Sequence, residues 1–432
     1  MIFVRLRIFI LLSGCLFLCS ELSLADSSEA NTSNLEAIQD IASGKRETAN
    51  AAWWGFNQED ATDALQSAID SKAKTVRIPY MGNPWLVRPI TLRSNQEIIL
   101  EPGVVVLAMK GEFQGTGDSL LKATDQNDIT IRGYGAILRM RKKEYQSQEY
   151  AKGEWRMTLA FTGCQRIHVE GLRCESSGGD GIYIGSSTAN RWCEDVVIRN
   201  VTCIDHHRQG ISVISAVNLL IENCLLIGTR GTPPGAGIDL EPDMPDEKLV
   251  NCVVRNCIME DNEGHAILVY LKPLTKASEP VSILFENCLT RMNWNENVPS
   301  EESIQGWAGM AVGAVRDEGP QGTIEFRNCV TENSGKEGAK IFDKSADGVR
   351  VKFVNCSWKN AWAADYRDFG GPRVPIYITL RDKDITHKLG GADFEHCTVY
   401  DSVDRPSLWA EEEDSHFGIF DITGDIAVQN LN

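Results

Sequence analysis

The sequence has few of the features that would tie it to a metal, a membrane or a nucleic acid. Its 13 cysteines include no Cys-x-x-Cys pair, a spacing common in metal sites. Beyond the first 25 residues, no segment is apolar for long enough to cross a bilayer. Lys and Arg number 43 against 60 Asp and Glu, and this net charge of −17 argues against nucleic acid as a partner. A local basic groove can override the net charge, so an anionic polymer is not excluded.

What the chain does contain is a repeated phrase of alternating apolar and charged residues that closes on a cysteine. The alternation predicts short strands, and its recurrence with loops of unequal length is typical of a solenoid. We therefore predict an all-β fold, a single right-handed parallel β-helix over residues 56–432. The phrase ends at eight positions, namely Cys174, Cys203, Cys224, Cys257, Cys288, Cys329, Cys356 and Cys397.

The spacing of these cysteines predicts free thiols. Residues at one repeat position of a β-helix stack about 4.8 Å apart along its axis, so we expect a buried ladder of reduced thiols that pack as small apolar groups. Three cysteines, Cys164, Cys193 and Cys252, lie off this ladder, and one disulfide among them stays open.

The N-terminus predicts export. Residues 1–25 combine a basic start, an apolar core and the small-residue cleavage site Ser23-Leu24-Ala25, as signal peptides do. An alternative interpretation takes Leu12-Ser13-Gly14-Cys15 as a lipoprotein signal with lipid on Cys15. Either way we expect a secreted or periplasmic bacterial protein without stable membrane insertion. Residues 26–55 are polar and weakly patterned, which predicts a mobile leader.

The first part of the predicted domain resembles the pectin-lyase-like superfamily of parallel β-helices. Residues 60–70 place alanines, Leu65 and Ile69 on one face and predict a capping helix. A strand with the step Trp85-Leu86-Val87 and the turn Glu101-Pro102-Gly103-Val104 follow, as in that superfamily. The resemblance runs from about Phe56 to Cys397. It implies the fold and leaves the reaction open, because the superfamily includes hydrolases, lyases, epimerases and phage tailspikes.

Four strands that follow the cysteine phrases align with one another and predict a surface site. They begin at Asp180, Gln209, Ala236 and His265. Their Ile, Val and Leu positions share one parity and should fill the core. The opposite parity predicts two outward columns, the first made of Tyr183, Ser212, Asp239 and Leu268 and the second of Gly185, Ile214, Glu241 and Tyr270.

Paired carboxylates on these columns predict glycosidic bond cleavage. Asp239 and Glu241 lie two residues apart on one strand face, so their Cα atoms should be roughly 6.5–7 Å apart. One acid and one base at such a spacing suit an inverting glycoside hydrolase that needs no cofactor, with Asp180 as a third carboxylate. Substrate binding is expected from His207, Arg208, Tyr183, His265, Tyr270 and Lys272. The structural alternative is a solvated strand face with turn and loop residues around it.

The polygalacturonase-type hydrolases give a partial match within the superfamily. Gly179-Asp180-Gly181 resembles part of their first motif, and His207-Arg208-Gln209-Gly210 loosely resembles the third. The four aligned strands contain no adjacent Asp-Asp, and the sequence has no Arg-Ile-Lys motif. The resemblance therefore implies candidate roles for Asp180 and His207 alone.

Two further classes of function stay open. In a polysaccharide lyase or C5-epimerase acting on a uronate polymer, Arg208 or Lys272 would take the C5 proton. Asp180, Asp239, Glu241 or Asp243 would then neutralise the sugar carboxylate, with Ca²⁺ as a cofactor if the enzyme is a lyase. A non-catalytic glycan-binding solenoid or adhesin would bind without turnover. In each case we expect a monomer whose partner is a polysaccharide.

Overall fold

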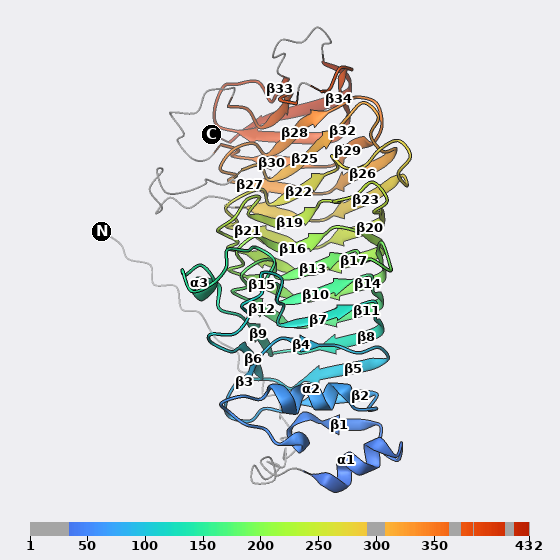
Figure 1. The fold of residues 1–432 in the computed structure, drawn as a ribbon. Helices are drawn as coiled ribbons and strands as arrows, with labels where there is room; N and C mark the ends of the chain where they lie inside the picture. Colours follow the sequence, from blue (N-terminus) through green and yellow to red (C-terminus); the bar gives the residue numbers. More distant parts are fainter. Residues whose placement is uncertain (1–33, 292–306, 363–372, 383, 411–418, 432) are drawn as a thin grey trace, which may run out of the picture.

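The chain winds into a single right-handed parallel β-helix (Figure 1). The computed structural model describes residues 34–291, 307–362, 373–382, 384–410 and 419–431. Successive coils stack so that corresponding strands pair in parallel, and each regular coil contributes one strand to each of three faces. The predicted fold class is confirmed. The predicted signal peptide, residues 1–25, lies outside the described residues.

The three faces follow one another along each coil. Face one is made of β1 (Thr48–Asn50), β2 (Thr75–Ile78), β5 (Gln96–Leu100), β8 (Asn127–Arg132), β11 (Gln165–Glu170), β14 (Cys193–Arg199), β17 (Ala216–Glu222), β20 (Leu249–Arg255), β23 (Val281–Glu286), β26 (Gly322–Arg327), β29 (Arg350–Val354), β32 (Leu389–Asp401) and β34 (Ile419–Asn430). Face two is made of β3 (Trp85–Val87), β6 (Val105–Ala108), β9 (Ile137–Arg139), β12 (Arg173–Glu175), β15 (Thr202–Ile204), β18 (Leu225–Ile227), β21 (Ile258–Glu260), β24 (Leu289–Arg291), β27 (Val330–Glu332) and β30 (Ser357–Lys359), after which β32 continues onto it.

Face three carries the predicted site. It is made of β4 (Ile90–Thr91), β7 (Leu121–Thr124), β10 (Leu159–Thr162), β13 (Ile182–Gly185), β16 (Gln209–Val213), β19 (Ala236–Leu240), β22 (Ile267–Tyr270), β25 (Met310–Val315), β28 (Ala339–Lys344), β31 (Ile376–Thr379) and β33 (Leu408–Ala410).

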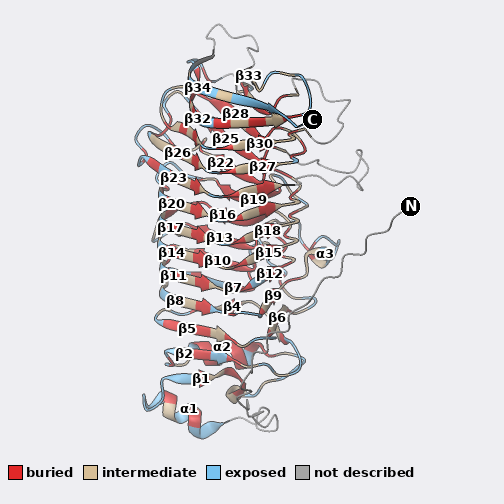
Figure 2. Cartoon of the chain, turned by 180° about the vertical axis from the view of Figure 1, so that it is seen from behind, coloured by how far each residue is buried: buried red, intermediate tan, exposed pale blue. Residues whose placement is uncertain are grey.

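The interior is filled by side chains that repeat from coil to coil. Ile182, Ile211, Ile238 and Ile267 pair in register on face three and are all fully buried, as their shared parity predicts. Figure 2 shows buried residues along the strands of the stacked coils, whereas the last strand, β34, is largely exposed. Near the C-terminal end, four phenylalanines stack with ring centroids 4.9–5.1 Å apart, close to the spacing of the strands themselves. They are Phe285, Phe326, Phe353 and Phe394.

In five of the eight repeated phrases an asparagine directly precedes the cysteine, and this Asn-Cys step lies at the corner between faces one and two. Its asparagines, among them Asn223, Asn256 and Asn287, adopt the left-handed conformation with φ near +55°, which asparagine tolerates better than most residues. Their side-chain amides also bond from coil to coil, with Asn287 Nδ2 3.2 Å from Asn256 Oδ1. The repeated asparagine therefore turns the chain, and the residue after it enters the core.

All eleven cysteines of the described residues are free and buried, as predicted for the eight that end the repeated phrase. The ladder, however, is shorter than expected. Cys224, Cys257, Cys288, Cys329, Cys356 and Cys397 follow the corner asparagine or histidine directly. Cys174 and Cys203 pair with each other two residues further on, and Cys203 is in register with Leu226 rather than with Cys224. No disulfide joins Cys164, Cys193 or Cys252.

The N-terminal end is closed by α1 (Leu35–Ala42), the short 3-10 helix η2 (Ala51–Trp54) and α2 (Thr62–Asp70), and α2 is the predicted capping helix. The leader predicted over residues 26–55 is wrong for residues 35–54. Strand β1 pairs with β2, and Ile41 and Ala49 are buried in the same core as the coils. The apolar end of a solenoid has to be covered, and this segment extends the cover. A fourth helix, α3 (Lys142–Tyr145), lies in a loop beside the coils.

Candidate active site

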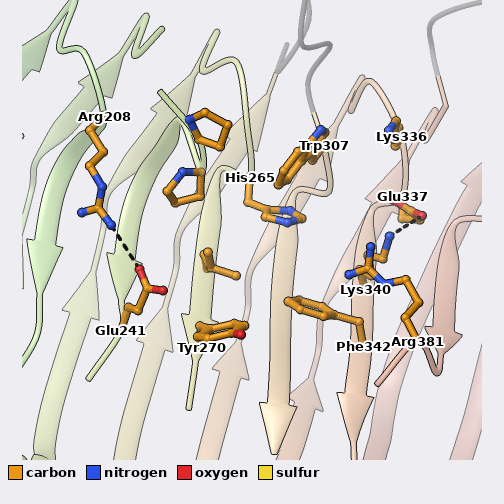
Figure 3. Close-up of a pocket in the computed structure, with 13 residues that line it drawn as sticks. Arg208, Glu241, His265, Tyr270, Trp307, Lys336, Glu337, Lys340, Phe342 and Arg381 are labelled. Atoms are coloured by element: carbon orange, nitrogen blue, oxygen red, sulfur yellow. Dashed lines mark hydrogen bonds and ion pairs between the residues drawn. The ribbon is translucent and has the colours of Figure 1, made fainter. Parts of the chain in front are cut away.

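A cavity of about 450 Å³ runs along face three, from the coil of β16 to the coil of β31 (Figure 3). One end is lined by Arg208 and Glu241, and the other end by Lys336, Lys340 and Arg381. Aromatic side chains line the stretch between them. We call this cavity the groove.

The predicted outward column exists in the predicted register. Tyr183 pairs with Ser212, Ser212 with Asp239, and Asp239 with Leu268. The expectation that Asp239 faces solvent is wrong, because its side chain is fully buried on the outer side of the sheet. Neighbouring side chains cover the column, so outward parity alone does not mean exposure.

Arg208 lies at the centre of four carboxylates, which we call the carboxylate cluster. Its Nη1 is 3.8 Å from Asp180 Oδ2, its Nη2 3.4 Å from Glu241 Oε2 and its Nε 3.5 Å from Glu154 Oε2. The fourth member, Asp239, accepts a hydrogen bond from Gln209 Nε2 at 2.6 Å. Gln209 is the first residue of β16 and directly follows Arg208. One coil therefore supplies both the cation and the hydrogen-bond donor that contact the four carboxylates.

Burial shifts the protonation of the two inner carboxyls. It raises the pKa of Asp239 well above its ordinary value, and the negative charge of Glu241 adds to this. It also raises the pKa of Asp180 to about 7, against the opposing effect of the Arg208 charge. Burial opposes the charge of Arg208, but the surrounding carboxylates raise its pKa overall. Burial and the charge of Glu241 both favour the protonated form of Asp239, while Arg208 stays charged.

The floor of the groove is apolar. Leu268 and Phe342 pack with alanines of neighbouring coils into a cluster on the outside of the sheet, and Tyr270 packs at its edge. His265 lies 4.8 Å from Trp307 in an edge contact and 6.3 Å from Phe342 in a stacked one, both measured between ring centroids. Apolar and aromatic surfaces of this kind suit the carbon faces of a sugar ring.

His265 has a defined hydrogen-bonding role in this floor. Its Nδ1 accepts the backbone N–H of Ala308 at 3.2 Å, which assigns the ring hydrogen to Nε2. Burial holds the pKa of His265 well below its ordinary value, so the ring stays neutral. It can donate a hydrogen bond from Nε2, but it is not a base at that nitrogen.

The groove gathers Arg208, Glu241, His265 and Tyr270 from the predicted residues, with Asp180 and Asp239 buried beside Arg208. The other three predicted residues do not line the groove. His207 bonds Thr232 Oγ1 at 2.9 Å and lines a second cavity of about 370 Å³ with Trp155. Tyr183 lies over Gly185, and Lys272 pairs with Asp382 at 3.3 Å.

Several groove residues were missed because the aligned strands were followed over only four coils. Met310 and Ala339 pair in the same register, and extending the alignment through them places Lys340 and Phe342 on the two outward columns. Glu154 reaches Arg208 from a loop of another coil, and no strand pattern indicates such a contact.

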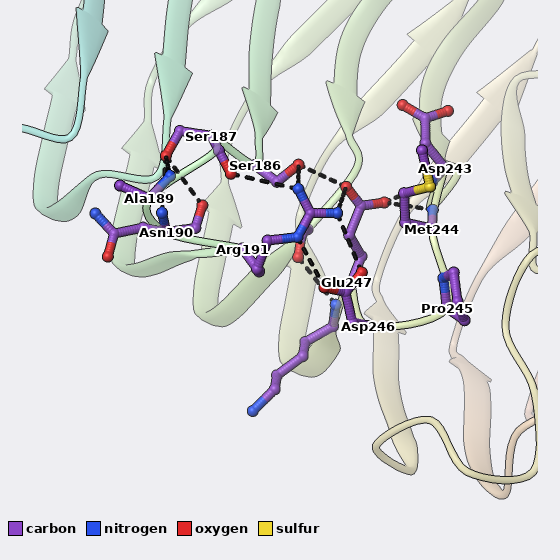
Figure 4. Close-up of polar contacts among 12 residues, drawn as sticks. Ser186, Ser187, Ala189, Asn190, Arg191, Asp243, Met244, Pro245, Asp246 and Glu247 are labelled. Atoms are coloured by element: carbon purple, nitrogen blue, oxygen red, sulfur yellow. Dashed lines mark hydrogen bonds and ion pairs between the residues drawn. The ribbon is translucent and has the colours of Figure 1, made fainter.

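The loop after Glu241 is held by a polar network (Figure 4). Glu247 is buried and its Oε2 accepts the backbone N–H groups of Asp243 at 2.6 Å and Met244 at 2.9 Å. Its Oε1 accepts a hydrogen bond from Ser186 Oγ at 2.6 Å. Arg191 joins the same network through Asp246 at 2.9 Å. These bonds tie the chain that follows Glu241 to the loop after β13.

Within the described ranges, no three His, Cys, Asp or Glu side chains come together as a group that could hold a metal ion. None of the helices in the described residues has the length and apolar character that a membrane crossing requires.

Comparison with known proteins confirms the fold. Residues 155–288 match the family described as "Right handed beta helix region". A family 28 exopolygalacturonase from Yersinia enterocolitica is similar over 89% of this chain and 77% of its own, with a TM-score of 0.55 and 14% identity. The A-module of the mannuronan C-5 epimerase AlgE4 from Azotobacter vinelandii is similar over 88% and 97%, with a TM-score of 0.57 and 13% identity.

A surface adhesin of Streptococcus pneumoniae, PfbA, has the same fold, with a TM-score of 0.58, 13% identity and coverage of 89% of this chain and 91% of the adhesin. No curated protein matches the chain in sequence. The chain thus has the right-handed parallel β-helix fold of these three proteins. Because a hydrolase, an epimerase and an adhesin share this fold, the reaction has to be argued from the site.

Proposed function

We propose that this protein cleaves a polysaccharide as a glycoside hydrolase, at the carboxylate cluster next to the groove. The observation that carries the proposal is the pairing of Asp239 with Glu241. Glu241 is 26% exposed at the groove, and Asp239, two residues before it, is fully buried, which raises its pKa and favours the protonated form. Glycosidic cleavage needs this combination of a proton donor and an ionised carboxylate.

In this proposal Arg208 controls access to the acid. Asp180 and Asp239 are fully buried, and the Arg208 guanidinium contacts both Asp180 and Glu241. A glycosidic oxygen reaches the buried Asp239 only if a side chain beside it moves, and we propose that this side chain is Arg208. A negatively charged sugar offers Arg208 an alternative partner, so an acidic polysaccharide suits the cluster better than a neutral one.

The test is turnover by Asp239→Asn on a panel of purified polysaccharides, measured as new reducing ends. The amide keeps the shape but cannot deliver a proton, so turnover should fall by about 10²–10⁴-fold. The matched control is Glu286→Gln, a half-buried carboxylate on β23 of face one, which should retain the wild-type rate. Equal loss, or no loss, in the two variants would contradict the assignment of Asp239.

The stereochemistry of the product tests the finer mechanism. NMR of the first product formed distinguishes inversion from retention at the anomeric carbon. Release of products that absorb in the ultraviolet would instead indicate β-elimination. The raised pKa of Arg208 makes it unsuited to take the C5 proton in such a reaction.

The closed state of the cluster favours one alternative, a glycan-binding protein without turnover. If Arg208 never leaves Asp180 and Glu241, the groove binds sugar but the acid stays out of reach. Saturable binding of a polysaccharide together with no new reducing ends across the panel would favour this alternative. For location, the proposal is export, on the sequence of residues 1–25, and N-terminal sequencing of the mature protein tests the predicted cleavage after Ala25.

A further inference from the structure

We infer that the far end of the groove is a binding site for an anionic substituent of the sugar chain, a uronate carboxylate or a sulfate ester. We call it the basic end; it is lined by Lys336, Lys340 and Arg381. The inference rests on the proposed function in one respect, that the groove binds a polysaccharide, but it does not require turnover.

The charges at the basic end carry the argument. Its three cations contrast with the net charge of −17 of the whole chain. Among the described residues, one acid lines the same end, Glu337, which is buried and lies 3.4 Å from Lys340 Nζ (Figure 3). Asp343 is 3.9 Å from Arg381 but accepts the backbone N–H groups of Arg381 and Asp382 as well. Lys340 and Arg381 thus outnumber Glu337, the acid that lines this end in the described part of the chain, and this balance suits an anionic ligand.

The cationic side chains are placed for a ligand in the groove. Lys340 lies on the outward column of Asp239, and its side chain is 17% exposed at the lining. Arg381 is 62% exposed and its guanidinium lies 5.4 Å from the centre of the Phe342 ring. Phe342 thus orients the planar guanidinium, which can contact a carboxylate or a sulfate through two nitrogens.

The spacing links this site to the carboxylate cluster. Asp239 lies on β19 and Lys340 on β28, with β22 and β25 between them, so three coil steps of about 4.8 Å separate them, roughly 14 Å along the axis. The apolar floor at Leu268 and Phe342 fills this interval. A sugar chain that lies along the axis would place its anionic group several sugar rings away from the bond at the cluster.

The experiment measures binding by calorimetry, at pH 7 and at two salt concentrations. The probes are polygalacturonate and alginate for carboxylates, carrageenan and dextran sulfate for sulfate esters, and unmodified dextran as the neutral polymer. The wild type should bind one of the two anionic classes and not dextran, and its affinity should fall as salt rises. The class that binds identifies the substituent.

The double variant Lys340→Met with Arg381→Gln should weaken that binding by about 10- to 100-fold, because two charge-assisted contacts are lost. The control is Lys359→Met. Lys359 lies on face two, away from the groove, and its Nζ is 2.9 Å from Glu332 Oε1. This variant should bind as the wild type does. An unchanged far-ultraviolet circular dichroism spectrum and melting temperature show that the double variant is folded.

Wild-type affinity in the double variant, or dextran binding as tight as that of the anionic polymers, would overturn the inference. Its failure is distinguishable from failure of the proposed function. Cleavage of a neutral polymer without polyanion binding would overturn the basic end and leave the hydrolase. Polyanion binding that depends on Lys340 and Arg381, with no cleavage of any polymer, would keep the basic end and overturn the hydrolase.

Discussion

Replacing Asp180 with asparagine should stabilise the protein at pH 8 and leave its stability nearly unchanged at pH 4. The carboxyl is fully buried, and burial raises its pKa from 3.8 to about 7. The native state therefore binds this proton more tightly than the unfolded chain does. It follows that the contribution of Asp180 to stability falls as pH rises from about 4 to about 7 and is constant above that.

The size of the effect follows from the two pKa values. Each pKa unit corresponds to 1.36 kcal/mol, so the penalty for ionising Asp180 in the folded protein reaches about 4 kcal/mol above pH 7. Asparagine keeps the shape of the side chain without the charge and avoids this penalty. Arg208 retains Glu241 and Glu154 as partners in the variant.

A neighbouring histidine gives the opposite pH dependence and sharpens the test. His206 is fully buried, and burial lowers its pKa from 6.5 to about 3. Its contribution is present above pH 6.5 and is lost as pH falls, by about 5 kcal/mol at pH 3. In the wild type the two contributions oppose each other between pH 4 and 6.5. Without Asp180, stability should rise with pH over that interval.

The assay is urea unfolding followed by circular dichroism from pH 4 to pH 8, with Glu286→Gln as the surface control. The quantity to compare is the difference in unfolding free energy between Asp180→Asn and the wild type. We expect it to grow steadily from pH 4 to pH 7. If the difference in unfolding free energy did not change with pH, the claim that burial raises the pKa of Asp180 would be refuted.

Four further outcomes are expected. Phe353→Ala removes the middle of the phenylalanine stack and should lower the unfolding free energy by about 3–5 kcal/mol in urea. Asn256→Ala at a left-handed corner should cost about 1–2 kcal/mol in the same assay, while Asn256→Gly should cost less. Arg156 is fully buried and donates to the carbonyls of Phe113 and Gln114, so Arg156→Met should lower the melting temperature, with a loss of about 3 kcal/mol or more. Thiol titration in denaturant without reductant should find the eleven described cysteines reactive.

The strand register could be predicted from the sequence because it depends on local alternation. Inward Ile238 and outward Asp239 follow from parity on a single strand, and parallel pairing then sets the columns. The alternation of apolar and charged residues does not show where the chain turns the corner, so it aligns Cys174 and Cys203 with the other ladder cysteines. These two cysteines follow the corner by three residues rather than one, so they pair apart from the ladder.

The chemistry of the site could not be predicted from the sequence in the same way, because it depends on contacts between distant segments. Asp239 is buried because side chains of other coils and loops cover it, and Glu154 comes from a loop whose path no periodicity describes. The same contacts change the protonation of Asp239 and Asp180, which sequence alone treats as ordinary carboxylates. Strand patterns therefore place the candidate residues, and long-range packing decides which of them meet a ligand.

The stacking of coils also makes distance along face three independent of loop length. Asp239 and Lys340 are far apart in the sequence, but only the coils of β22 and β25 lie between them. A loop can lengthen or shorten without moving either residue along the axis, whereas removal of one whole coil would bring them closer by about 4.8 Å. The distance between the two ends of the groove is therefore a whole number of coil spacings. The length of a ligand that bridges both ends would change through gain or loss of a coil rather than through substitution.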